Sequence, residues 1–246
     1  MKPLYLKGGQ PLTVKLDGPA LRVSQLGRSC QRFPLTRISR VVVSGSVEWA
    51  TSALLRCADS GITVSFLDGA SGEMRARFFG KSNGTGTLAR LWANFLDRPD
   101  HASLLREWRE NARRRAIGLC ALRLGCDVTT LLTRQDAFIT VPPAEKRELE
   151  GLMRKLDGLI ESRLLQELSR HGLSGGDADL LELIPDLAIT MQWALRPDLS
   201  IWWKKRHRRH NGIDPAVAFL ERAAGTVDFQ LRDALHSLRR FLRRFD

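Results

Sequence analysis

The chain contains no long apolar run and no cysteine pair with the spacing of metal ligands. None of its apolar stretches approaches the roughly 18 residues of a membrane span, and its first residues carry lysines where a signal peptide would be apolar. The four cysteines include no CxxC pair, which argues against a zinc site and against a disulfide framework. These absences predict a cytoplasmic globular protein whose thiols are reduced.

Acidic residues are in deficit along the chain. The 27 Asp and Glu residues against 39 Lys and Arg give a formal net charge of +12 over 246 residues. Such an excess is typical of proteins that bind polyanions, and in the cytoplasm it indicates nucleic acid. No phosphate-binding glycine loop, GxSxG or HExxH motif occurs, which argues against NTPases, serine hydrolases and metalloproteases.

The first eighty residues follow the pattern of β-strands. Short segments with alternating or β-branched apolar residues are separated by turn residues such as Asp17-Gly18. One amphipathic helix is expected over residues 50–58, where apolar residues recur at a spacing of three and four. The expected strands cover residues 12–16, 20–24, 38–44, 62–67 and 74–79.

Helical periodicity replaces the strand pattern after residues 81–87, whose sequence KSNGTGT is typical of a linker. Helices are expected over residues 88–96, 103–124, from Pro143 to Gly172, 180–195 with an interruption at Pro185, and 229–245. The predicted fold class is α+β. A small N-terminal β domain with one packed helix, residues 1–80, precedes a larger α-helical domain, residues 88–246.

Basic residues gather on one predicted helix, in the run KKRHRRH after Trp202-Trp203, and at the C-terminus. Such clusters bind phosphates without reading sequence, and the paired tryptophans could stack on an unpaired base. The alternative is a solvated charged surface, with Glu107 and Glu110 available for pairing at helical spacing. The predicted DNA-binding residues are Arg106, Arg109, Arg113, Lys204, Lys205, Arg208, Arg209 and Arg239; the clusters also hold Arg114, Arg115, Arg240, Arg243 and Arg244.

Asp233 and His236 are spaced to project from the same face of the last predicted helix. Together with a residue of the preceding helix they could share a divalent ion, because mixed carboxylate and imidazole ligation suits Mn²⁺ or Mg²⁺ in phosphodiester chemistry. The alternative is an ordinary polar helix face without a ligand.

Three segments resemble the CRISPR adaptation integrase family, that of the CRISPR-associated protein numbered one. Residues 37–80, RISRVVVSGSVEWATSALLRCADSGITVSFLDGASGEMRARFFG, are similar to the N-terminal β domain of the family. The segment NGIDPAVAFLE, residues 211–221, resembles the family's Gly-Leu-Asp-Pro-x-x-Gly-Phe-Leu-His turn and helix. Residues 233–239 resemble its last aspartate motif. The resemblance covers most of the chain.

The resemblance implies a site in which a glutamate, a histidine and an aspartate bind Mg²⁺ or Mn²⁺. Glu150 stands at the position of the family's glutamate, and Asp233 stands at that of the aspartate. Glu221 occupies the histidine position, and His236 occupies a position where the family usually has a second acid. The predicted catalytic residues and metal ligands are therefore Glu150, Glu221 and Asp233, with His236 as a further metal ligand.

Two interpretations of this altered ligand set follow. In the first, the protein joins captured DNA fragments to a CRISPR array by attack of a 3′-hydroxyl on a phosphodiester, assisted by Mg²⁺ or Mn²⁺. In the second, the site has decayed and the protein is a dimeric DNA-binding module. The resemblance also implies double-stranded and branched DNA as ligands, a homodimer through the β domain, and the small CRISPR-associated protein numbered two as a partner. A nucleic-acid-binding regulator outside the family is a third interpretation, but no helix-turn-helix or aromatic sheet motif supports it.

Overall fold

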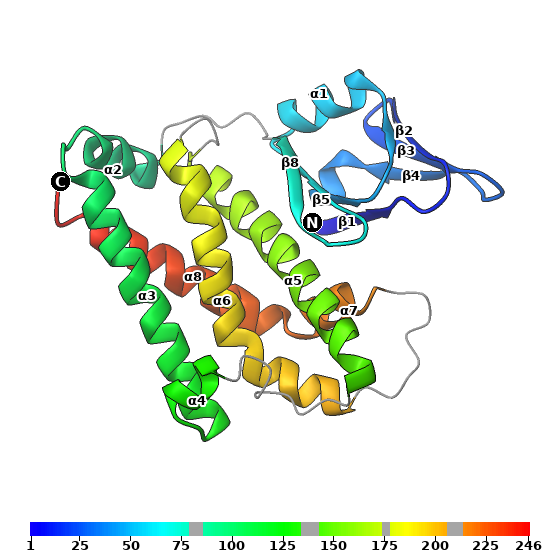
Figure 1. The fold of residues 1–246 in the computed structure, drawn as a ribbon. Coiled ribbons are helices and arrows are strands. Elements are labelled where there is room, and N and C mark those ends of the chain that lie inside the picture. The colour runs from blue at the N-terminus through cyan, green and yellow to red at the C-terminus, as the bar shows by residue number, and fades with distance from the viewer. Residues whose placement is uncertain (79–85, 134–142, 174–177, 206–213) are drawn as a thin grey trace. The chain divides into compact units, whose positions relative to one another are not determined.

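The computed structural model describes residues 1–78, 86–133, 143–173, 178–205 and 214–246 (Figure 1). The chain divides into two compact units. Unit 1 comprises Met1–Ala89 with Glu161–Asp177, and unit 2 comprises Arg90–Ile160 with Ala178–Asp246. A unit boundary falls inside helix α5 (Pro143–Arg170), so the two halves of this helix belong to different units. The predicted fold class, α+β with strands first and helices after, is confirmed.

Unit 1 contains two four-stranded sheets with the strand orders β1-β5-β7-β8 and β4-β3-β2-β6. In the first sheet β1, β5 and β7 run parallel, and β8 is antiparallel to β7. In the second sheet β2, β3 and β4 are antiparallel, and β6 pairs in parallel with β2. The elements are β1 (Lys2–Lys7), β2 (Leu12–Asp17), β3 (Ala20–Gln25), β4 (Gln31–Pro34), β5 (Ile38–Ser44), β6 (Glu48–Trp49), α1 (Thr51–Asp59), β7 (Thr63–Leu67) and β8 (Met74–Phe78), with a 3-10 turn at Leu35–Arg37.

The five predicted strands and the predicted helix of this unit are confirmed to within one residue at each end. Strands β1, β4 and β6 were not predicted. β4 and β6 are too short to show an alternating pattern, and Pro3 near the start of β1 argues against a strand in a sequence considered alone.

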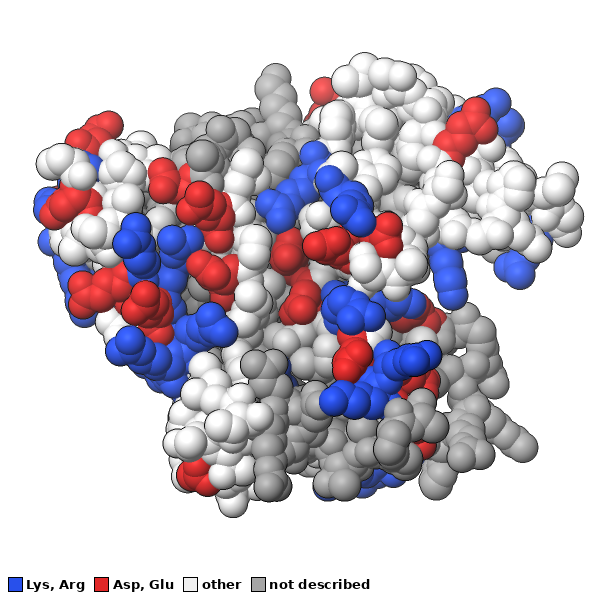
Figure 2. All heavy atoms as spheres, in the orientation of Figure 1, with Lys and Arg blue, Asp and Glu red and all other residues white. Residues whose placement is uncertain are grey.

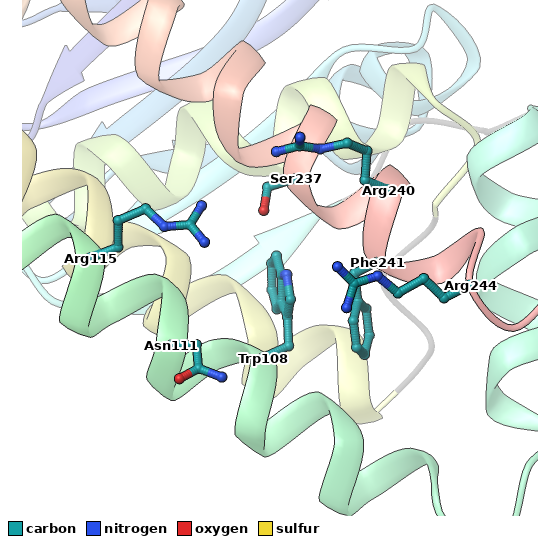
Figure 3. Close-up of a pocket in the computed structure, with 7 residues that line it drawn as sticks. All are labelled: Trp108, Asn111, Arg115, Ser237, Arg240, Phe241 and Arg244. Atoms are coloured by element: carbon teal, nitrogen blue, oxygen red, sulfur yellow. The ribbon is translucent and has the colours of Figure 1, made fainter.

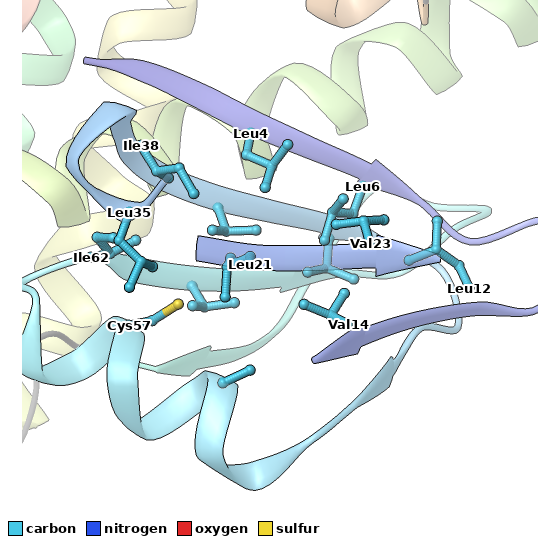
Figure 4. Packing of buried hydrophobic residues seen from close by; sticks show 14 residues of the cluster. Leu4, Leu6, Leu12, Val14, Leu21, Val23, Leu35, Ile38, Cys57 and Ile62 are labelled. Atoms are coloured by element: carbon cyan, nitrogen blue, oxygen red, sulfur yellow. The ribbon is translucent and has the colours of Figure 1, made fainter. Parts of the chain in front are cut away.

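Both sheets and α1 contribute to one apolar core in unit 1 (Figure 4). Val14 of β2 and Leu21 of β3 are fully buried, as the period-two alternation of these strands requires. Val41 and Val43 of β5 belong to the same core, and so does Cys57 of α1. Burial raises the pKa of the Cys57 thiol to about 11, so this cysteine stays protonated at neutral pH.

The opposite face of the β1-β5-β7-β8 sheet contacts the second half of α5. Buried Arg40 of β5 donates from Nη1 to Oε1 of Gln166, 3.1 Å away, and from Nη2 to the hydroxyl of Tyr5, 3.3 Å away. Arg77 of β8 donates to Oε2 of Glu161 at 2.8 Å. Burial raises the pKa of Glu161 while the charge of Arg77 lowers it. β5 is therefore covered on both faces within unit 1, which explains its uniformly apolar valine run.

Unit 2 is helical, and α3 packs mainly against α6, which in turn contacts α8. None of the helices in the described ranges is long and apolar enough to cross a membrane. The expected helices are present, and two short ones, α4 and α7, were not predicted from periodicity. The remaining elements are α2 (Thr87–Leu96), α3 (His101–Leu124), α4 (Val128–Thr133), α6 (Ala178–Lys205), α7 (Pro215–Arg222) and α8 (Ala224–Leu242).

Helix α6 continues through Pro185 and Pro197, so the predicted interruption at Pro185 is wrong. A proline inside a helix costs about 3 kcal/mol, mainly through a lost hydrogen bond and a steric clash. Leu183, Ile184 and Leu187 around it are all buried, and this packing outweighs the cost.

Gly45, directly after β5, is a position of unit 1 where a side chain would be poorly tolerated. Its φ is +83°, and an added Cβ would lie 2.6 Å from the carbonyl oxygen of Gly8. We expect Gly45→Ala to lower the free energy of unfolding by more than about 1 kcal/mol in chemical denaturation.

Gly9→Ala is the matched control for this substitution. An added Cβ there meets no atom within 4 Å, so we expect a change below about 0.5 kcal/mol. Equal effects of the two substitutions would show that the close approach of Gly45 to Gly8 is not what restricts this position.

Candidate nucleic-acid interface

Helix α3 buries one face and exposes another. Leu105, Ile117 and Cys120 are buried and recur at helical spacing along the side that packs on α6. Arg106 and Arg113 point away from this side and are exposed. The predicted basic helix is thus present, and only part of its arginines face solvent.

Arg109 differs from its neighbours because it is used inside unit 2. Its side chain is only 17% exposed, and Nη1 lies 3.1 Å from Oδ2 of Asp186 and 3.9 Å from Oε2 of Glu182, both on α6. Figure 2 shows basic and acidic side chains interleaved over α3 and α6 on the face in view. Since its charge is already neutralised by carboxylates, Arg109 is a structural residue between helices in this arrangement.

A groove of about 530 Å³ lies between α3 and α8 (Figure 3). It forms because residues one and two turns apart on each helix face the same space. Trp108, Asn111 and Arg115 line it from α3. Ser237, Arg240, Phe241 and Arg244 line it from α8 and from the residues directly after that helix.

Aromatic rings form the apolar part of this groove. Trp108 stacks on Phe241 with ring centroids 5.5 Å apart and an interplanar angle of 28°. Phe241 is buried and makes an edge contact with Phe95 at 5.3 Å. The indole is therefore fixed in place by packing, which lowers the entropy cost of any contact that a ligand makes with it.

Three guanidinium groups surround the indole. Figure 3 shows the side chains of Arg115, Arg240 and Arg244 turned toward the space that contains Trp108. No acidic side chain lines the groove, and these arginines form no ion pair with any residue that the structure describes. Like charges this close repel one another, so an anion bound among them would be stabilised.

Further arginines along α3 and the end of α8 also lack an ion pair within the described part of the chain. Arg106, Arg113 and Arg243 are exposed, and Arg239 is half-buried. By contrast, Arg114 lies 3.5 Å from Glu110, and Arg90 binds Asp246 at 3.1 Å. We call Arg106, Arg113, Arg239 and Arg243, together with the three groove arginines, the arginine surface of unit 2.

The KKRHRRH run lies mostly outside the described residues. Lys204 and Lys205 end α6 and are exposed, whereas Arg208 and Arg209 belong to residues 206–213, which the structure does not describe. The neighbouring tryptophans are not open platforms, because Trp203 is 6% exposed and Trp202 packs edge-on against Phe219 with centroids 5.6 Å apart. Trp203 is therefore too buried to stack on a base, and stacking by Trp202 stays a prediction.

The predicted metal ligands lie on three helices of unit 2. Glu150 is on α5, Glu221 is on α7, and Asp233 and His236 are one turn apart on α8; all four side chains are exposed. The described residues include no group of three or more His, Cys, Asp or Glu side chains that could hold a metal ion. The structure therefore does not bring three of the predicted ligands together.

Comparison with known proteins bears on both units. The family model described as CRISPR associated protein Cas1 matches residues 6–119. The solved structure of TM1797, a CAS1 protein from Thermotoga maritima, superimposes with a TM-score of 0.70 at 12% identity, over 98% of this chain and 96% of that one. The chain therefore resembles the Cas1 family in the sequence of residues 6–119 and in its fold. The solved structure of TtCas1 matches with a TM-score of 0.61 at 12% identity, over 96% and 98% of the two chains.

The match to the family model and the shared fold confirm the predicted resemblance to this family. No match is found among curated protein sequences. The residues matched by the Cas1 family model extend from β1 into α3. They end before all four predicted metal ligands, so the match does not bear on those residues.

The groove was not predicted from the sequence, although part of its residues belong to predicted clusters. Arg115, Arg240 and Arg244 belong to the predicted basic clusters, whereas Trp108, Asn111 and Ser237 belong to no predicted cluster. The signal was available in principle, because Trp108 and Arg115 are seven residues apart and so share a helix face. What the sequence did not reveal is that α3 and α8 bring these faces together.

Proposed function

We propose that this chain is a Cas1-family protein that binds DNA in CRISPR adaptation, with the arginine surface of unit 2 as its main contact to phosphates. The observation that carries the proposal is the set of arginines on α3 and the end of α8 that no described carboxylate neutralises. Folding a domain with unpaired like charges on neighbouring helices raises its free energy, and a phosphate backbone offsets that repulsion.

Double-stranded and branched DNA are the proposed ligands because arginine contacts to phosphate carry no sequence information. Direct binding of a short duplex by the full chain in the presence of EDTA tests the proposal. We expect similar affinities for duplexes of unrelated sequence. Absence of binding at low salt, or strong dependence on base sequence, would contradict it.

The homodimer and the partnership with the second adaptation protein, Cas2, stay predictions. The resemblance implies a dimer through the β domain, which contains the apolar strands β5 and β7. Within unit 1 the first sheet packs on the apolar core with one face and contacts the second half of α5 with the other. A dimer contact would therefore involve other surfaces of unit 1 than the faces of these two strands.

The strand-joining reaction that the family resemblance implies, with Glu150, Glu221 and Asp233 as catalytic residues, also stays a prediction. A metal ion in such a reaction polarises the phosphate and offsets charge on the leaving oxygen. Because the predicted ligands do not converge in this structure, we assign no step to them. The second interpretation, a DNA-binding protein without catalysis, needs no such convergence and is the one that we propose.

We expect Mn²⁺ to leave the melting temperature of the full chain unchanged and to promote no joining of an oligonucleotide to plasmid DNA. A formed site occupied at 100 times its Kd would stabilise the fold by about 2.7 kcal/mol, an easily measured rise in melting temperature. Differential scanning fluorimetry with and without Mn²⁺, beside a strand-joining assay, makes the measurement.

Asp233→Ala and Glu221→His serve as the diagnostic variants for this prediction. A Mn²⁺-dependent stabilisation of the parent chain that disappears in Asp233→Ala would establish the integrase interpretation instead. Gain of joining activity in Glu221→His would show that the helices can gather a ligand set once the family's histidine is restored.

A further inference from the structure

We propose that the groove between α3 and α8 is a nucleotide site, in which an unpaired base stacks on Trp108 while its phosphate is bound by Arg115, Arg240 and Arg244. The inference rests on the proposed DNA-binding function, because the same arginines belong to the arginine surface. It goes further by assigning the groove to a nucleotide whose base is not paired. A duplex alone does not need such a position.

The size and lining of the groove suit this ligand. Its volume of about 530 Å³ falls within the range of sites for small molecules and cofactors, roughly 300 to 1,000 Å³. A smooth basic surface would bind a duplex backbone without a hollow. A hollow with an aromatic ring at its centre provides for a planar group, and the arginines around the ring provide for its negative charge (Figure 3).

Trp108 is prepared for stacking by its own packing. One side of the indole rests on Phe241, and Phe241 is in turn held by Phe95 and by Phe245, at centroid distances of 5.3 Å each. Because the ring already lines the groove, a base can stack on it without a rearrangement of the helix. Stacking of bases on aromatic side chains tolerates any base, which agrees with sequence-independent binding.

The polar groups around the ring are matched to a phosphate and a base edge. The guanidinium groups of Arg115, Arg240 and Arg244 offer paired N–H donors, the geometry that favours bidentate binding of phosphate oxygens. Asn111 and Ser237 add side-chain groups that can both donate and accept. The nearby carboxylate of Asp246 is occupied by Arg90 and Asn94, so it does not compete for the groove arginines.

The site can receive its nucleotide from two sources, a free mononucleotide or an unpaired residue in a DNA strand. The test therefore compares a blunt duplex, the same duplex with a single-stranded extension that contains 2-aminopurine, and free deoxyadenosine monophosphate as competitor. Fluorescence of 2-aminopurine reports stacking, and anisotropy reports affinity. The full chain is used throughout.

We expect the extended duplex to bind about ten-fold more tightly than the blunt one, with quenching of 2-aminopurine, as one base stack supports. Trp108→Ala and the pair Arg240→Ala with Arg244→Ala should each remove that advantage. Trp108→Phe keeps an aromatic ring, so this variant should keep most of the affinity advantage of the extended duplex. If the mononucleotide removes the advantage of the extended duplex without changing the binding of the blunt duplex, the ligand is a free nucleotide. If the mononucleotide does not compete, the ligand is an unpaired residue of the strand.

Equal affinities for blunt and extended duplexes, without quenching, would overturn the nucleotide site while leaving the proposed DNA binding intact. If the parent chain binds neither the blunt nor the extended duplex, the proposed DNA-binding function is itself wrong. Because Trp108 packs on Phe241, its alanine variant can lose stability, so the exposed arginine pair provides the independent variant. An advantage of the extended duplex that survives in the arginine pair variant would also overturn the proposal.

Discussion

Replacing Arg106, Arg113, Arg239 and Arg243 together with alanine is expected to lower the affinity of the full chain for duplex DNA by about 10³-fold or more at 0.1 M salt. Each phosphate contact releases about 0.9 of a counterion, and four lost contacts at this salt concentration multiply to that order. These side chains line no part of the groove, so the effect measures the part of the arginine surface that lies outside the groove. Anisotropy titration with a short duplex is the measurement.

A variant of unit 1 with the same change in net charge is the matched control. The arginines for it are exposed, form no ion pair with a described residue, and lie on β3, in a loop, in the 3-10 turn and on α1: Arg22, Arg28, Arg37 and Arg56. We expect their replacement to change affinity only several-fold, through the long-range field. Equal losses in both variants would mean that net charge, and not the arginine surface of unit 2, controls binding.

Much of unit 1 could be predicted because its strands are short segments of alternating or continuously apolar residues, and because its turns carry their own chemistry. β2 and β3 show this best, since Asp17 and Gly18 end one strand and Ala20 begins the next. The contacts that could not be predicted join segments that lie far apart in the sequence. Gln166 and Glu161 reach the first sheet from a helix more than eighty residues later in the chain, and no local pattern reveals that pairing.

The candidate site was predicted less well than the fold. A basic residue on a helix has the same sequence signature whether it binds phosphate or a carboxylate of a neighbouring helix, and Arg109 is the second case. Trp108, by contrast, lines the candidate site but was not predicted to do so. An isolated tryptophan at helical spacing usually belongs to a core, and only the approach of α8 creates the groove around it.

Raising the salt concentration from about 50 to 200 mM is expected to weaken duplex binding by about 10³-fold or more, the loss typical of six to ten phosphate contacts. The arginine surface offers about this number of cations on α3 and at the end of α8, beside Lys204 and Lys205. Base-specific hydrogen bonds do not release counterions in this way. Affinity measured across a salt series therefore reports directly on phosphate contacts.

An affinity that changes only a few-fold over this range would show that few phosphates are neutralised, whatever the net charge of the chain. Binding that weakens for one duplex sequence much more than for another would indicate base contacts in addition.

The slope of log K against log salt concentration, compared between the parent chain and the variant lacking Arg106, Arg113, Arg239 and Arg243, tests the central claim most directly. If each of these side chains contacts a phosphate, the slope of the variant is shallower than that of the parent by about 3.6, which is four times 0.9. The unit 1 control variant keeps the parent slope. Identical slopes for the parent and the unit 2 variant would contradict the claim that DNA lies on the arginine surface.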